Sequence, residues 1–160
     1  MGLFSNLFAR GEPTLSEAAS RDAAAIAALH AASFRRGWSE QEVEGLLTDR
    51  PVIAHRVMTG SAMAGFIMSR LVEDEAEILS VAVAGQRRGR GLARNLLNLH
   101  LRRLAAFGAR AVFLEVDEHN KAAIRLYDRA GFHEISRRPN YYPGPGGQAV
   151  AALVLRRDLV

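Results

Sequence analysis

Cysteine is absent from this chain of 160 residues, which excludes disulfide bonds and thiol catalysis and agrees with a reducing cytoplasm. No apolar run approaches the roughly 20 residues that a membrane-spanning helix needs. The first residues lack the basic, apolar and cleavable regions of a secretory signal. No serine stands in a Gly-x-Ser-x-Gly elbow, so a hydrolase triad has no support. We therefore expect a cytoplasmic protein.

Lysine is nearly absent as well, because Lys121 is the only lysine among 21 basic residues, and the net charge is +4. Such modest basicity suits an anionic cofactor or association with a ribonucleoprotein. The arginines are scattered and no aromatic ladder accompanies them, which disfavours direct nucleic-acid binding. The histidines show no metal-ligand spacing, so we expect no metal site and interpret each as a lone surface or core residue. They are His30, His55, His100, His119 and His133.

Apolar periodicity, helix caps and glycine turns predict the order βααβββαβαββ, a mixed sheet covered by helices. We expect strands over 14–18, 52–58, 62–72, 76–83, 111–117, 132–138 and 149–156. We expect a helix that Ser20 caps and that runs to about Phe34, a second helix from a capping box at Ser39 and Glu42, and helices over 92–107 and 120–130. The sequence thus predicts one α/β domain over residues 13–160, with a loop over 139–147.

Residues 1–12 are interpreted as an N-terminal extension. Its apolar side chains share one face of a short helix, and they are Leu3, Phe4, Leu7 and Phe8. We expect this face to pack on the domain, with a membrane-surface or oligomer contact as the alternative. The whole chain is expected to be a monomer or a weak homodimer.

The most informative segment is Gln86-Arg87-Arg88-Gly89-Arg90-Gly91, which lies between an expected strand and an expected helix. Its two glycines let the backbone turn sharply and bring N–H groups close to a bound group. The helix start adds free amide donors and the positive end of the helix dipole. This combination predicts a cradle for an oxyanion, with a pyrophosphate as the favoured ligand.

Two familiar nucleotide motifs do not fit this segment. A G-x-G-x-x-G fingerprint would need glycine at Arg94, and no Gly-Lys-Ser/Thr follows as in a P-loop. Without its neighbours, the segment could equally be a solvated basic patch. The arginines of that patch would be Arg87, Arg88, Arg90 and Arg94. The flanking strand and helix favour the cradle.

Glu115 is the most conspicuous acidic residue, because its neighbours in Val112-Phe113-Leu114-Glu115-Val116 are apolar. Desolvation there would bring its carboxyl into the range of a general base for an amine. Strand alternation equally directs Glu115 to a solvated face with Phe113 and Asp117. Periodicity does not decide between these interpretations.

Two further positions have a catalytic and a structural interpretation. Tyr127 could give a proton to a departing thiolate, because the reference pKa of a phenol exceeds that of a thiol. A helical tyrosine between apolar residues is more often part of the core, and this reading is favoured without further context. Asn120 is interpreted as an ordinary helix N-cap. Tyr141-Tyr142, between prolines, forms either a binding lip or an anchor for its loop.

The segment over 86–91 resembles the Q/R-x-x-G-x-G/A acyl-CoA signature of the GCN5-related N-acetyltransferase (GNAT) family. The likeness runs from about Thr14 to the C-terminus and is densest after Glu75. Within the family, the chain is most similar to the bacterial ribosomal-protein-alanine N-acetyltransferases. The similar stretches are Trp38-Ser39-Glu40, Phe113-Leu114-Glu115-Val116, Asn120-Lys121-Ala122-Ala123-Ile124, Leu126-Tyr127 with Ala130-Gly131-Phe132, and Arg137-Arg138-Pro139-Asn140-Tyr141-Tyr142-Pro143.

The resemblance implies the GNAT fold and direct, metal-free transfer of acetyl from acetyl-CoA to an amine within a ternary complex. It implies that Glu115 deprotonates the amine and that Tyr127 protonates the leaving thiolate. The implied cofactor-binding residues are Val81, Ala82, Val83, Arg87, Arg88, Gly89, Arg90, Gly91, Leu92 and Asn120. The implied acceptor-binding residues are Trp38, Tyr141 and Tyr142.

The implied acceptor is the N-terminal α-amine of a ribosomal protein of the small subunit, with alanine first. The alternatives are a GNAT enzyme for a lysine side chain or a small amine, and a silent acyl-CoA-binding module. The presence of both Glu115 and Tyr127 argues against the silent module. One departure is the connection Ala84-Gly85, roughly two residues shorter than this group would have, where we expect Gly85 to absorb the tighter turn.

Overall fold

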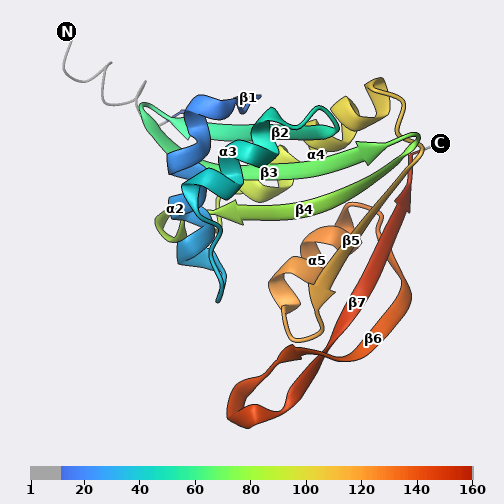
Figure 1. The fold of residues 1–160 in the computed structure, drawn as a ribbon. Coiled ribbons are helices and arrows are strands. Elements are labelled where there is room, and N and C mark those ends of the chain that lie inside the picture. The colour runs from blue at the N-terminus through green and yellow to red at the C-terminus, as the bar shows by residue number, and fades with distance from the viewer. Residues whose placement is uncertain (1–11, 160) are drawn as a thin grey trace, which may run out of the picture.

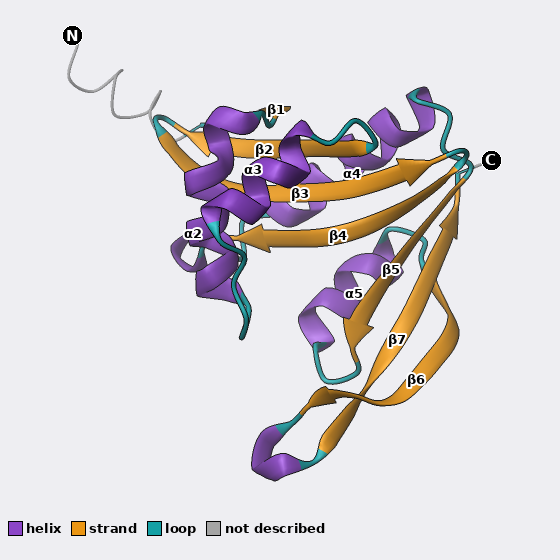
Figure 2. Ribbon diagram, in the orientation of Figure 1, coloured by secondary structure: helices purple, strands orange, loops and turns teal. Residues whose placement is uncertain are grey.

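The computed structural model describes residues 12–159, and its helices and strands follow the predicted order (Figures 1 and 2). The strands are β1 (Pro13–Glu17), β2 (Val52–Thr59), β3 (Ala62–Val72), β4 (Glu75–Val83), β5 (Ala111–Asp117), β6 (His133–Pro143) and β7 (Ala149–Asp158). The α-helices are α2 (Ala23–Ser33), α3 (Glu40–Thr48), α4 (Leu92–Ala106) and α5 (Lys121–Arg129). The short 3-10 turns are η1 (Ser20–Asp22), η2 (Gly85–Arg87) and η3 (Pro145–Gly147). Residues 1–11, most of the predicted extension, lie outside the described residues.

All seven strands belong to one sheet in the order β1-β2-β3-β4-β5-β7-β6. Every neighbouring pair is antiparallel except β4 and β5, which run parallel. These two strands pair only over 75–77 and 111–113. Figure 1 shows them diverging beyond that point, so that the sheet opens into a V. The second half of β4 therefore has no ladder partner on the β5 side.

Helices cover both faces of the β1–β4 half of the sheet (Figure 1). On one face, α2 and α3 bury Ile26 and Val43 against Phe66 and Met68 of β3. On the other face, α4 and α5 share a second and larger apolar cluster. The residues that α4 buries lie along one side of the helix, and they are Leu92, Leu96, Leu97, His100, Leu101 and Leu104.

Two local predictions about helix starts have different outcomes. Ser39 Oγ accepts the N–H of Glu42 at 3.1 Å, which confirms the cap of α3. Ser20 does not cap α2, so that prediction is wrong. The chain instead makes the turn η1, where a carboxylate oxygen of Asp22 accepts the N–H of Ala19 at 2.8 Å. The carboxylate satisfies a backbone donor that the helix start would otherwise leave open.

The first part of the loop predicted over 139–147 is strand, because β6 extends to Pro143, and the remainder forms the connection through η3 to β7. The register of β6 with β7 shifts between Arg138 and Tyr142. Asn140 has φ +59° within this interval, a left-handed conformation that asparagine tolerates better than most residues. Pairing with β7 on both sides of the irregularity keeps residues 139–143 extended, so the loop prediction is wrong there and correct for the glycine-rich turn that follows.

The prediction that all histidines are lone residues is wrong for two of them. His55 Nδ1 lies 2.7 Å from His100 Nδ1, and His100 Nε2 lies 2.6 Å from Ser69 Oγ. All three side chains are buried between α4, β2 and β3. Burial, helped by His55, lowers the pKa of His100 to about 3. The chain of contacts therefore joins neutral imidazoles, each with one donor and one acceptor nitrogen.

Stability should depend on this buried pair. Between the ordinary pKa of 6.5 and the folded value of about 3, the unfolded chain binds more protons at His100. The stability that the folded protein gains by keeping His100 neutral is therefore fully present above pH 6.5 and is lost as the pH falls toward 3. We expect His100→Gln to lower the free energy of unfolding at pH 7 by about 2 kcal/mol, because hydrogen bonds are lost, and to flatten its acid dependence. Urea unfolding at several pH values measures both, with the exposed His133→Gln as control. An equally steep profile in His100→Gln would contradict this account.

Candidate functional site

β4 contains an extra residue just beyond the positions where it pairs with β5. Met68 pairs with Ser80, whereas Ser69 pairs with Ile78, so Leu79 is the extra residue of a β-bulge. Beyond the bulge, the N–H of Ala84 bonds to the C=O of Ala64 on β3. Hydrogen-bonding directions alternate along an antiparallel strand, so they can be assigned to the residues before Ala84.

This alternation turns the backbone groups of Val81 and Val83 away from β3, toward the open side. The Arg88 side chain supports the assignment, because its Nε donates to the C=O of Val83 at 3.2 Å. The three predicted cofactor-binding residues of β4 thus differ in what they present. Ala82 is buried under α2 and α3, while Val81 and Val83 present the polar backbone edge.

The glycine segment follows as a short turn and then the start of α4. The turn η2 closes the short connection through the bond from Arg87 N–H to Ala84 C=O at 2.8 Å. Gly89 and Gly91 have φ of +79° and +74°, and a Cβ on either would meet nothing within 4 Å. Gly85 begins the turn η2 without a positive φ, so the turn does not require glycine at this position. At positions 89 and 91, glycine is favoured because the backbone has a positive φ, and not because a side chain would lack space.

The remaining cofactor candidates surround this turn. Leu92 is buried and anchors the first turn of α4 in the core. The backbone N–H donors of this helix start begin at Gly91. The side chains of Arg88 and Arg90 are exposed, and Arg87 is half-buried. Such guanidinium groups beside free helix-start amides suit a diphosphate. Asn120 lies elsewhere, at the start of α5, where its Oδ1 accepts the N–H of Ala123 at 3.2 Å.

Glu115 lies on the face of β5 that it shares with Phe113 and Asp117, as the alternation predicted. Its side chain is 25% exposed, so it is neither dry nor fully solvated. Arg138 Nη1 lies 3.1 Å from Glu115 Oε1. Both side chains line an open hollow of about 520 Å³ that also includes Glu77 of β4. The structure thus brings a carboxylate and an arginine together where the V begins.

Tyr127 approaches β5 from the opposite face. It is 4% exposed, belongs to the cluster that contains Leu114 and Val116, and meets the edge of the Phe132 ring at a centroid distance of 5.5 Å. Burial raises the pKa of its phenol well above the ordinary value of 10. The structural interpretation of Tyr127 as a core residue is therefore correct. The side chain also stays protonated, as a proton donor must.

The acceptor candidates are distributed over two elements. Trp38, after α2, stacks on His30 at 4.0 Å between ring centroids, and the backbone N–H of Trp38 donates to His30 Nδ1 at 3.0 Å. Burial lowers the pKa of His30, which keeps that nitrogen available as an acceptor. Tyr141 is exposed on β6, with the Arg138 guanidinium 5.4 Å from its ring centroid. The side chain of Tyr142 lies outside the described residues.

Comparison with known proteins assigns the fold. The sequence model of the acetyltransferase (GNAT) family matches residues 23–132. The chain belongs to this family. The ribosomal protein bS18-alanine N-acetyltransferase of Salmonella typhimurium is 35% identical over 117 residues, which cover 73% of this chain and 78% of the relative. The enzyme of the same name from Escherichia coli K12 is 34% identical over 117 residues, which cover 73% of this chain and 78% of that relative.

Solved structures agree with this assignment. The crystal structure of the ribosomal-protein-S18-alanine N-acetyltransferase from Escherichia coli has a TM-score of 0.86 at 28% identity, covering 92% of this chain and 94% of that one. Arabidopsis thaliana NAA60 in complex with acetyl-CoA shares the fold, with a TM-score of 0.82 at 18% identity over 92% and 99% of the two chains. The predicted family and fold are confirmed, and the chain is an acetyl-CoA-dependent N-acetyltransferase.

The open backbone edge, the two positive-φ glycines and the amides at the start of α4 fit a thioester carrier with a diphosphate. The described residues contain no group of three or more acidic or histidine side chains suited to a metal ion. Within residues 12–159, no helix has the length and apolarity to cross a membrane.

Sequence reasoning missed two contacts made by candidate site residues, that of Arg138 with Glu115 and that of His30 with Trp38. Arg138 was noticed only as part of a motif, because its contact with Glu115 spans two strands that are distant in the chain. His30 gave no signal beyond its place on a helix, since the contact with Trp38 depends on how the chain turns after α2. Both contacts depend on tertiary structure rather than on spacing.

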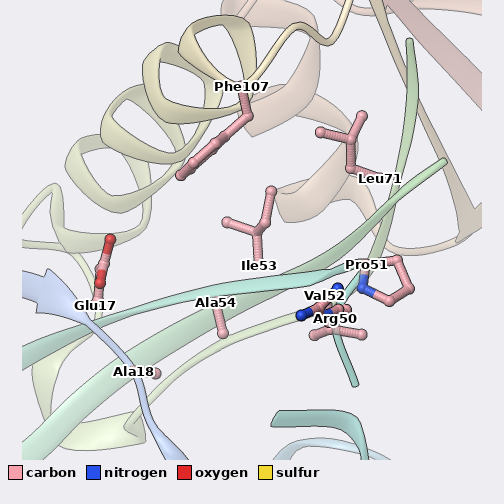
Figure 3. Close-up of a pocket in the computed structure, with 9 residues that line it drawn as sticks. All are labelled: Glu17, Ala18, Arg50, Pro51, Val52, Ile53, Ala54, Leu71 and Phe107. Atoms are coloured by element: carbon pink, nitrogen blue, oxygen red, sulfur yellow. The ribbon is translucent and has the colours of Figure 1, made fainter. Parts of the chain in front are cut away.

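A second hollow, of about 390 Å³, lies beside β1 and the start of β2 (Figure 3). Figure 3 shows the Phe107 side chain, at the end of α4, extending toward the space between Glu17 and Ile53, with Leu71 on the other side of Ile53. None of the predicted site residues lines this hollow. It is therefore separate from the candidate acyl-CoA site.

The turn offers a matched pair of glycine variants. In Gly91→Ala, an L-residue must adopt φ +74°, which disfavours that conformation by about 1–2 kcal/mol. We expect acetyl-CoA affinity to fall roughly tenfold, because binding must restore the strained turn. Gly85→Ala, with open space and no positive φ, should bind normally. Isothermal titration calorimetry measures both, and equal affinities would contradict the account of the cradle.

Proposed function

We propose that this enzyme acetylates the N-terminal α-amine, with alanine first, of a protein of the small ribosomal subunit in the bacterial cytoplasm. The names of the Salmonella typhimurium and Escherichia coli relatives support this acceptor. The observation that carries the proposal is the pairing of two opposed groups across β5. A half-buried carboxylate, Glu115, lies on one face, and a buried phenol, Tyr127, lies on the other.

In the proposed reaction, the carrier lies along the open edge of β4 while the acceptor enters from the Glu115 face. The backbone N–H groups at Val81 and Val83 polarise the thioester carbonyl and stabilise the charge that develops on its oxygen. The diphosphate is held by the amides around Gly89 and Gly91. Holding both substrates together makes the transfer direct, within a ternary complex.

Proton transfers by Glu115 and Tyr127 complete the scheme. Glu115 takes a proton from the acceptor ammonium, directly or through one water, and the free amine attacks the thioester carbon. The C–S bond breaks, and the sulfur receives a proton from the Tyr127 hydroxyl. The attacking nitrogen, now part of the amide, releases its second proton to solvent, and the Tyr127 oxygen regains a proton from solvent. Dry surroundings disfavour a thiolate as they do a phenolate, so the burial that raises the pKa of Tyr127 also makes the leaving sulfur a better proton acceptor.

Replacing Glu115 separates chemistry from cofactor binding. Glu115→Gln keeps the shape of the side chain but cannot accept a proton, so we expect kcat to fall by about 100-fold or more. Acetyl-CoA affinity should remain unchanged, because the cradle lies on other elements. Glu134→Gln, an exposed carboxylate on β6, is the control. Steady-state kinetics with calorimetry measure the variants, and an unchanged rate for Glu115→Gln would remove this residue from the base role.

A panel of acceptors tests the substrate class. We expect turnover of synthetic peptides that begin with alanine, copied from small-subunit proteins, and no turnover of the same peptides with a blocked N-terminus. Peptides with an internal lysine and a blocked N-terminus, and small amines, serve as the alternative acceptors. Mass spectrometry locates the acetyl group on each product. Turnover of lysine or small amines alone would refute acetylation of a protein N-terminus.

A further inference from the structure

Arg138 contacts the carboxylate that the proposed mechanism uses, although the mechanism itself assigns this arginine no task. Its Nη1 lies 3.1 Å from Glu115 Oε1. Within the described part of the chain, Oε2 of the same carboxylate has no ion-pair partner. A cation beside one carboxylate oxygen restricts the rotation of the group and leaves the second oxygen unpaired, and the Glu115 side chain lines the hollow.

Other arginines on this face of the sheet are engaged elsewhere. Arg70 of β3 pairs with Asp49 at 3.3 Å. Arg156 of β7 pairs with Asp158 at 2.9 Å and lies over the Phe113 ring at 5.0 Å. Arg138 is the arginine that reaches Glu115, so the contact does not arise from a general excess of positive charge around the carboxylate.

The local structure of β6 holds Arg138 in this place. The guanidinium lies 5.4 Å from the centroid of the Tyr141 ring, within the range of a cation–π contact. Tyr141 follows Asn140, whose φ of +59° belongs to the irregularity that shifts the register of β6. The register shift of β6 thus occurs where the Tyr141 ring contacts the guanidinium of Arg138, which in turn contacts Glu115.

We propose that Arg138 is a positioning residue for acetyl transfer, acting through Glu115. By holding Oε1, it directs Oε2 toward the acceptor amine, and Tyr141 steadies the guanidinium. The inference rests on the proposed function, in which Glu115 is the base. It explains why an arginine that is 56% exposed should matter, although exposed ion pairs contribute little to stability.

The neighbouring arginine provides a matched control. Arg137 has a similar exposure of 51%, but it pairs with Glu118 at 3.0 Å and with Glu134, not with Glu115. Arg138→Gln and Arg137→Gln each remove one positive charge from the same strand. Thermal unfolding of both variants reports whether either change disturbs the fold, and we expect small and equal shifts because both side chains are largely exposed.

Steady-state kinetics with acetyl-CoA and an alanine-first peptide test the inference. We expect Arg138→Gln to lower kcat by about 10-fold, the scale of loss when a reacting group is misplaced, with KM for acetyl-CoA unchanged. Arg138→Lys should recover part of kcat, because an ammonium can contact one oxygen. Arg137→Gln should match the unmodified enzyme.

The double variant Glu115→Gln/Arg138→Gln decides whether Arg138 acts through Glu115. We expect it to be no slower than Glu115→Gln alone, since the arginine then has no base to position. A further 10-fold loss in the double variant, or a loss in Arg138→Gln that Arg137→Gln reproduces, would overturn the inference. If Arg138→Gln is fully active while Glu115→Gln is slow, only the inference fails. If Glu115→Gln is fully active, the proposed base fails and the inference fails with it.

Discussion

The site depends on a backbone constraint, which is the early end of pairing between β4 and β5. Three ladder positions join the strands, and their divergence leaves the polar edge of β4 without a partner strand. Unpaired N–H groups on a strand edge invite another strand or a ligand. Here the bulge at Leu79 and the alternation beyond it direct Val81 and Val83 to that edge. Among the described residues, the backbone N–H groups of Val81 and Val83 are thus unpaired because the ladder between β4 and β5 stops early.

The two faces of β5 supply different environments. Glu115 shares its face with solvent and Arg138, where a carboxylate can exchange protons. Tyr127 lies among apolar side chains on the other face, where its phenol stays protonated. One strand therefore separates the proposed proton acceptor from the proposed proton donor, since alternation along β5 directs Glu115 to the face opposite the one that Tyr127 contacts. This separation is the main reason that the geometry suits transfer from a thioester to an amine.

Much of the fold was predictable because the signals are local. The apolar stripe of α4, the cap at Ser39 and the hairpin of β2 and β3 each depend on residues within one or two turns of chain. Predictions failed where distant partners intervened. Ser20 gave way to Asp22 at the start of α2, whose carboxylate is also paired with Arg56 of β2. The extension of β6 through a segment rich in proline and tyrosine depends on pairing with β7.

The sequence by itself determined the order of elements, the glycine turn and the residues that resemble a known family. Glycine at 89 and 91 is legible in the sequence because positive φ is a property of single residues. Only the tertiary structure decided that His55 meets His100, that Trp38 stacks on His30 and that Arg138 holds Glu115. Each of those contacts joins residues from different elements, so it depends on packing and strand register, which no local pattern of amino acids encodes.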